Sequence, residues 1–123
     1  MKIIIDTNFL LIPAQFKVDI FSEIDRLCDS SYKVYIFDKT INELEKIIKK
    51  QRGKHKAAAN LALQLVKKFK INKLKATKNV DDAIVSLAKK ERIIVATQDK
   101  ELKKRLKGTR LIVLRKKSYL EFN

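Results

Sequence analysis

Short apolar runs alternate along this 123-residue chain with stretches in which apolar residues recur every three or four positions. Three isoleucines follow Lys2, and such a continuous run predicts a short strand that is buried on both faces. The other runs and stretches predict strands at 33–37, 71–76, 92–96 and 111–114, and helices at 19–28, 40–50, 55–69, 80–91 and 100–107. The tripeptide Asp6-Thr7-Asn8 is predicted to open a loop, and residues 115–123 to form a charged tail.

This order of elements predicts an α/β fold. Strands that are separated by helices of about ten residues are joined by right-handed crossovers, which give a mainly parallel sheet with helices on both faces. The length is sufficient for one compact core. We therefore expect a single three-layer α/β/α domain over residues 1–123.

The charge balance of the chain indicates the kind of partner that it binds. The chain has 29 lysines and arginines against 14 acidic residues, a formal net charge of +15. Such an excess favours a polyanionic partner, with nucleic acid ahead of a membrane surface. Lysine-rich, isoleucine-rich composition is also typical of growth at high temperature, although glutamate normally rises as well. Neither a membrane-spanning run nor a signal peptide is visible, and the lone Cys28 excludes an internal disulfide, so a cytoplasmic location is expected.

Acidic residues follow two of the predicted strands. Asp6 comes directly after the isoleucine strand, where a charge is costly to bury, and Asp99 comes just past strand 92–96. Glu43 and Asp82 lie near the starts of helices that we expect at the same edge. In open parallel sheets, ligands bind at the carboxyl ends of the strands. These four carboxylates are therefore candidates for one site.

Helix capping is the structural alternative for three of them. Thr40 and Glu43 fit a capping box, and Asp99 fits an N-cap. Asn79 could cap the next helix, with Asp81 and Asp82 complementing the helix dipole. Taken singly, capping explains Glu43, Asp82 and Asp99 better than catalysis does, whereas Asp6 favours function.

As a set, four converging carboxylates would repel one another and raise their pKa values unless something compensates. Nearby lysines could do so, but Mg²⁺ or Mn²⁺ prefers such oxygen ligands, activates water and stabilises an in-line phosphoryl displacement. Other chemistries lack their signals, since His55 is the only histidine and neither a Walker A sequence nor GxGxxG occurs.

The basic residues indicate where a phosphate backbone would lie. One cluster starts directly after Asp99, and another surrounds the turn at Gly53. With only nine aromatic residues, contacts to the backbone are a stronger expectation than base stacking. The candidates for contact with a nucleic-acid backbone are Lys100, Lys103, Lys104, Arg105, Arg52 and Lys54.

Four blocks in order complete the pattern: Ile5-Asp6-Thr7-Asn8, Glu43-Leu44-Glu45-Lys46, Asp81-Asp82-Ala83-Ile84 and Val95-Ala96-Thr97-Gln98-Asp99. With these blocks, the chain resembles the PIN-domain nucleases over essentially its whole length. The blocks around Asp82 and Asp99 resemble most closely the rRNA-processing branch related to the small-subunit processome. VapC-type toxin ribonucleases share the acidic set with less of the surrounding sequence.

The resemblance implies a metal-dependent endoribonuclease for single-stranded RNA, acting in rRNA processing with Mg²⁺ or Mn²⁺. By this resemblance, Asp6, Glu43, Asp82 and Asp99 form the acidic quartet, which is supported by Thr7, Asn8, Thr97 and the neighbouring Asp81. Two alternatives stay open: a VapC-type toxin with an antitoxin partner, and a non-catalytic RNA-binding protein of ribosome assembly. The resemblance also suggests a homodimer. A flap-type DNA nuclease would need helical elements for which the chain has no room.

Overall fold

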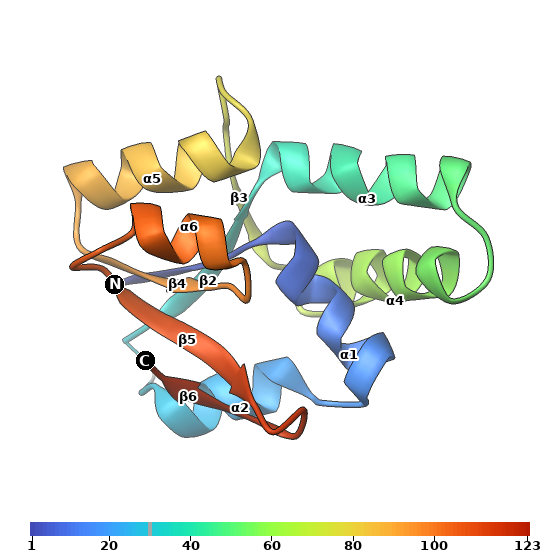
Figure 1. Ribbon diagram of the computed structural model, residues 1–123, viewed down its shortest axis with the longest axis horizontal. Coiled ribbons are helices and arrows are strands. Elements are labelled where there is room, and N and C mark those ends of the chain that lie inside the picture. Colours follow the sequence, from blue (N-terminus) through green and yellow to red (C-terminus); the bar gives the residue numbers. More distant parts are fainter. Residues whose placement is uncertain (30) are drawn as a thin grey trace.

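The computed structural model describes residues 1–29 and 31–123. In these residues one six-stranded sheet runs through the molecule with helices on both faces (Figure 1). The strand order is β3-β2-β1-β4-β5-β6, and every neighbouring pair is parallel except β5 and β6. The strands are β1 (Lys2–Ile5), β2 (Lys33–Phe37), β3 (Asn72–Leu74), β4 (Ile93–Ala96), β5 (Arg110–Arg115) and β6 (Tyr119–Phe122).

The helices divide between the two faces of the sheet. They are the 3-10 helix η1 (Thr7–Leu11), α1 (Ile12–Phe16), α2 (Ile20–Leu27), α3 (Asp38–Lys50), α4 (Lys54–Lys68), α5 (Val80–Lys90) and α6 (Lys100–Arg105). Residues of η1 and α1 to α4 fill one hydrophobic core, and residues of α5 and α6 fill the other. The predicted α/β fold with a mainly parallel central sheet is confirmed.

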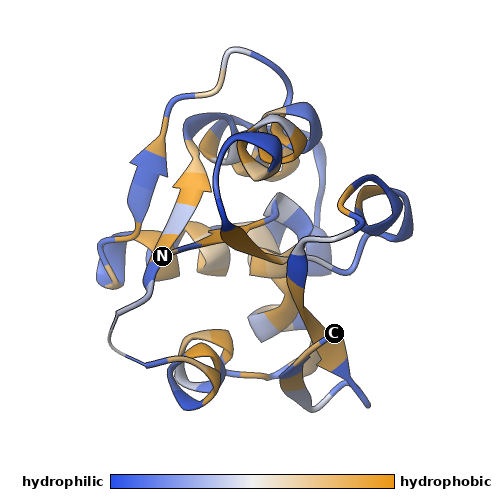
Figure 2. Cartoon of the chain, turned by 90° about the vertical axis from the view of Figure 1, so that its left-hand side faces the viewer, coloured by the Kyte–Doolittle hydropathy of each residue, from blue (hydrophilic) through white to orange (hydrophobic). Residues whose placement is uncertain are grey.

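The isoleucine run is buried because β1 lies in the middle of the sheet, between β2 and β4. Successive side chains of a strand point to opposite faces, so Ile3 and Ile5 enter the first core and Ile4 enters the second. Apolar residues accordingly concentrate on the sheet and on the inner sides of the helices (Figure 2). β1 therefore ends in a fixed position, and the residue that follows it, Asp6, is fixed with it.

Two segments differ from the sequence prediction. Residues 7–16 are helical rather than a loop, because Pro13 occupies the first turn of α1 and apolar side chains here pack into the core. The charged tail contains β6, whose Leu120 is buried.

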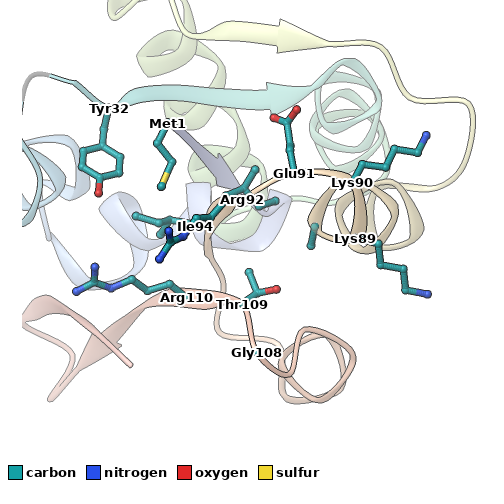
Figure 3. Close-up of a pocket in the computed structure, with 12 residues that line it drawn as sticks. Met1, Tyr32, Lys89, Lys90, Glu91, Arg92, Ile94, Gly108, Thr109 and Arg110 are labelled. Carbon is teal, nitrogen blue, oxygen red and sulfur yellow. The ribbon is translucent and has the colours of Figure 1, made fainter.

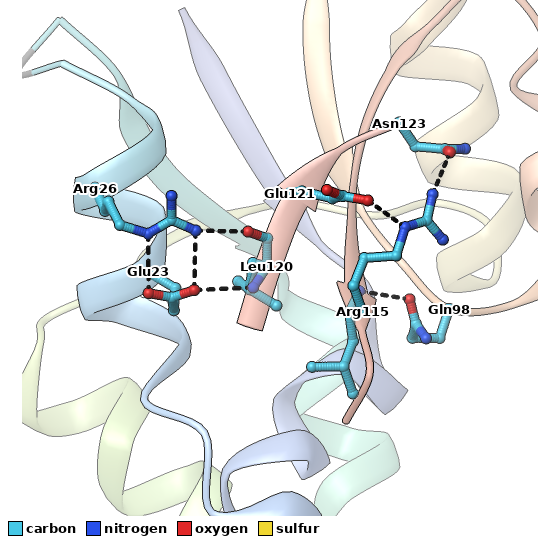
Figure 4. Close-up of polar contacts among 8 residues, drawn as sticks. Glu23, Arg26, Gln98, Arg115, Leu120, Glu121 and Asn123 are labelled. Atoms are coloured by element: carbon cyan, nitrogen blue, oxygen red, sulfur yellow. Dashed lines mark hydrogen bonds and ion pairs between the residues drawn. The ribbon is translucent and has the colours of Figure 1, made fainter. Parts of the chain in front are cut away.

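Polar contacts between distant residues hold β6 in place (Figure 4). The Leu120 amide donates to Glu23 Oε1 at 2.9 Å, and Arg26 Nη2 donates to the Leu120 carbonyl at 2.7 Å. Arg115 pairs with Glu121 on the neighbouring strand. The contacts of Leu120 with Glu23 and Arg26 join residues that are more than ninety positions apart, so the sequence around β6 does not reveal them.

Smaller differences concern helix ends. α3 begins at Asp38, two residues earlier than predicted, and α6 ends at Arg105. Gly108 does not cap α6 but lies in the turn beyond it, with φ of 89°. In the described ranges, no helix has the length and apolar character needed to cross a membrane.

Candidate active site

Asp6 is a buried carboxylate at the carboxyl end of β1, with a side chain that is only 4% exposed. Its amide donates to the Ala96 carbonyl at 3.0 Å, which joins the ends of β1 and β4. The hydroxyl of Thr97 donates to Asp6 Oδ2 at 3.0 Å and accepts from the Asp99 amide at 3.1 Å. Thr97 thus ties Asp6 to the loop that carries Asp99.

Burial, with smaller contributions from the negative charges of Asp81 and Asp99, raises the pKa of Asp6 to about 6. Hydrogen bonds from Thr97 and the Thr7 amide act in the opposite direction. Burial also raises the pKa of Asp81, with Asp99 as the next cause. Asp6, Asp81 and Asp99 are therefore close enough to repel one another, as expected at a shared sheet edge.

Asp82 points elsewhere, which differs from the arrangement expected from the sequence. Its Oδ1 accepts from Arg105 Nη2 at 2.6 Å, and this guanidinium lowers the pKa of the carboxyl. Its Oδ2 accepts from Asn79 Nδ2 at 3.1 Å, while Asn79 Oδ1 caps the Asp82 amide at 2.9 Å. Adjacent helix residues differ by about 100° in direction, so a site that Asp81 faces is one that Asp82 turns away from.

Glu43 is oriented by the residue after Asp6. Thr7 Oγ1 donates to Glu43 Oε1 at 2.6 Å and bonds the buried hydroxyl of Thr40 at 2.9 Å. The predicted capping box between Thr40 and Glu43 is wrong, because α3 starts at Asp38 and places Glu43 in the second turn. Sequence reasoning took Thr40 for a cap and missed that its hydroxyl supports Thr7.

Asp99 and Asn79 do act as caps, as the capping alternative predicted. Asp99 Oδ1 accepts from the Leu102 amide at 3.0 Å and begins α6. This bond uses one carboxylate oxygen, so capping and a role in the site are compatible. Asn8 is exposed on η1.

The donor chemistry of this edge suits a divalent cation. Within residues 1–29 and 31–123, no three Asp, Glu, His or Cys side chains gather tightly enough to ligate one ion directly. Mg²⁺ does not require such a cage, because it usually keeps several waters and binds through one or two carboxylates. A cation would also relieve the repulsion that raises the pKa values of Asp6 and Asp81.

The predicted RNA-contact residues fall at two distances from these carboxylates. The α6 group begins beside Asp99: Lys100 and Lys104 are exposed, and burial followed by the charges of Arg115 and Lys100 lowers the pKa of Lys103. Arg52 and Lys54 are exposed beyond the far end of α3. At about 1.5 Å per residue, that end lies roughly 10 Å past Glu43.

A parallel α/β sheet with acidic residues at the carboxyl ends of β1 and β4 is the framework of a PIN domain. The sequence profile of the PIN-like domain family matches residues 3–117, and the chain belongs to this family. The resemblance inferred from the four acidic blocks is confirmed.

Two ribonucleases of the VapC type are similar to this chain in sequence. The chain is 38% identical over 125 residues to ribonuclease VapC4 of Methanocaldococcus jannaschii, an alignment that covers 98% of this chain and 95% of the relative. It is 32% identical over 105 residues to ribonuclease VapC9 of Archaeoglobus fulgidus, covering 85% and 74%.

Two solved structures have a similar fold. The PIN domain endonuclease Utp24 superimposes with a TM-score of 0.81 at 26% identity, over 99% of this chain and 90% of that one. A domain of a functionally unknown M. jannaschii protein, 18% identical, has a TM-score of 0.62 over 93% and 91% and supports the fold alone. Both branches named from the sequence are represented, and the two VapC ribonucleases are the more similar in sequence.

Proposed function

We propose that this protein is a VapC-type endoribonuclease that hydrolyses single-stranded RNA with Mg²⁺ or Mn²⁺. The observation that carries the proposal is Asp6, a buried carboxylate whose pKa is raised beside two further carboxylates. Burying such a carboxylate lowers the stability of the fold, and a bound cation would offset that loss. The net charge of +15 supplies the attraction to a phosphate backbone.

In this proposal one or two of Asp6, Asp81 and Asp99 would bind the ion directly and the others would bind its waters. Glu43, held by Thr7, would orient the attacking water. The ion, when bound, supplies water activation and neutralises charge that develops on the phosphoryl oxygens. Thr97 acts as a positioning residue because its hydroxyl fixes the Asp6 carboxylate and the Asp99 backbone together. The Asp82 side chain pairs with Arg105 and accepts a hydrogen bond from Asn79, so its contribution is indirect.

The choice of the VapC reading over rRNA processing rests on the relatives. Both curated relatives are VapC ribonucleases, and VapC4 shares 38% identity against 26% for Utp24. A toxin role implies an antitoxin partner and growth arrest on expression. The Utp24 likeness keeps rRNA processing as the second candidate, with a ribosome-assembly partner. In either case we propose a cytoplasmic protein, and a homodimer follows from the family resemblance.

A cleavage assay tests the proposal. End-labelled single-stranded RNA, the matching duplex and the matching single-stranded DNA are incubated with the protein in Mn²⁺, Mg²⁺ or EDTA. We expect internal cuts in the single-stranded RNA that require the metal, and at least a hundredfold slower cutting of the duplex. Asp6→Asn protein, purified in parallel, controls for contaminating nucleases.

Binding of the RNA without cleavage in any metal would contradict the proposal and favour the non-catalytic RNA-binding alternative. Expression in cells then separates the two catalytic readings. A toxin arrests growth with wild-type protein and not with Asp6→Asn. An rRNA-processing enzyme leaves growth unchanged, and rRNA precursors accumulate when it is removed.

A further inference from the structure

A basic cavity of about 660 Å³ lies at the opposite edge of the sheet from the acidic site (Figure 3). Its lining comes from the amino ends of four strands, with Met1 before β1, Tyr32 before β2, Arg92 before β4 and Arg110 at the start of β5. The carboxylates of the proposed active site follow the carboxyl ends of the same sheet. Nothing in the proposed chemistry uses this cavity.

The positively charged residues that line the cavity suit an anionic ligand. Arg92 and Arg110 line it, as do two lysines of α5. Its single carboxylate, Glu91, is already paired with Lys2 at 2.8 Å. Figure 3 shows Glu91 and both lysines pointing away, whereas Arg92 and Arg110 lie around the central space with Tyr32 and Met1. Arg92, Arg110 and Tyr32 therefore line the same cavity.

These groups match a nucleotide. Guanidinium groups bind phosphate through paired hydrogen bonds, and aromatic rings and guanidinium planes stack on unpaired bases. The Arg110 guanidinium is held 3.9 Å from the Phe122 ring centroid, so its plane is already oriented. A stacking platform beside phosphate ligands is typical of sites for single-stranded nucleic acid.

Helix α6 connects this cavity to the acidic edge. Asp99 caps its first turn, and the turn after its last residue contains Gly108, which lines the cavity. Exposed Lys100, Lys104 and Lys107 follow the path between them. The strand that runs alongside, β4, has four residues and so spans about 10 Å. A single strand would need roughly four or more nucleotides to cover both sites.

We propose that this cavity is a second RNA subsite, which holds a nucleotide of the substrate strand several positions from the cut. The inference rests on the proposed function, since it places the flank of an RNA whose scissile phosphate lies at Asp6. In this proposal the RNA strand lies along α6 between the two subsites. A free nucleotide carries the same chemistry, and the experiment below separates the two sources.

Fluorescence anisotropy in EDTA, where no cleavage occurs, measures the binding of a single-stranded RNA of 12 nucleotides. The test variant combines Arg92→Gln with Arg110→Gln, and the control combines Lys67→Gln with Lys68→Gln, exposed residues at the end of α4. The test variant and the control variant each lose two positive charges. Arg92→Glu alone is a second test that leaves the Arg110 contact with Phe122 intact, and AMP is the free-nucleotide competitor.

We expect the test variant to bind the 12-nucleotide RNA about tenfold more weakly than the wild type does. Loss of two phosphate contacts should reduce the slope of log K against log salt by about 1.4. The control should keep the wild-type slope. Equal losses in test and control would overturn the subsite.

AMP that binds through Arg92 while the 12-nucleotide RNA binds normally would overturn it too, and would indicate a free-nucleotide site. The cleavage assay in Mn²⁺ reports separately on the proposed function. Cleavage with unchanged binding in the variants rejects the subsite alone. Binding that depends on Arg92 without any cleavage rejects the proposed function and keeps the cavity as an RNA site.

Discussion

Replacing Asp6 by asparagine should stabilise the metal-free protein at neutral pH. The pKa of Asp6 rises from 3.8 to about 6 on folding, chiefly because the carboxylate is buried. At about 1.4 kcal/mol per unit of pKa, ionised Asp6 lowers the free energy of unfolding by about 3 kcal/mol. Asparagine removes the charge and keeps an oxygen that can accept from Thr97. For a chain of this length, the gain corresponds to a rise in Tm of roughly 10 °C.

The pH dependence identifies the cause. A folded-state pKa above the unfolded value means that the folded protein holds the proton more tightly. The stability that this provides is fully present below about pH 4 and is lost as the pH rises through 6. The difference in unfolding free energy between Asp6→Asn and wild type should therefore be flat below pH 4 and grow to about 3 kcal/mol by pH 7 to 8.

Urea denaturation in EDTA, at intervals from pH 3.5 to 8, measures this difference. Any constant offset from exchanging oxygen for NH₂ cancels, because the pH dependence is the quantity that decides. Asp25→Asn on the exposed side of α2 is the matched control and should change stability by less than about 0.5 kcal/mol at every pH. A difference between Asp6→Asn and wild type that does not vary with pH would refute the reasoning.

Three further predictions concern neighbouring parts of the structure. Asp81→Asn should slow RNA cleavage at least a hundredfold, whereas Asp82→Asn should slow it less and lower stability only slightly through its lost ion pair with Arg105, as measured by single-turnover kinetics and urea denaturation. Thr7→Ala should destabilise the fold by about 1–2 kcal/mol, because it leaves a buried hydroxyl without its partner, and Thr7→Ser should restore most of that stability. Lys116→Asn combined with Lys117→Gly should raise the free energy of unfolding by about 1–2 kcal/mol, since both lysines adopt positive φ in the β5–β6 turn; an unchanged urea midpoint would contradict this.

The central strands and most helices could be predicted from the sequence because their patterns are local. The isoleucine run specifies a strand buried on both faces, and strand 33–37 has the predicted bounds. β6 could not be predicted, because Glu23 and Arg26, which bond the backbone of its Leu120, are about a hundred positions away in the chain. Propensity in a short charged segment is too weak to reveal such contacts.

The candidate active site, like the fold, could be predicted from the sequence only in part. Asp6 stands out in the sequence because a carboxylate after a buried strand has no packing reason. The distinction between Asp81 and Asp82 depends on helix rotation and on Arg105, which belongs to a different helix. The sequence alone could not show that Thr40 supports Thr7 rather than capping α3.

Thermal unfolding of wild type and Asp6→Asn at pH 8, with and without Mn²⁺, tests most directly the claim that the Asp6 edge is a metal site. Mn²⁺ at a hundredfold excess over its Kd should stabilise the wild type by about 2.7 kcal/mol. Asp6→Asn should melt higher than wild type in EDTA and gain little from the metal. Equal stabilisation of both proteins by Mn²⁺, or of neither, would contradict the account.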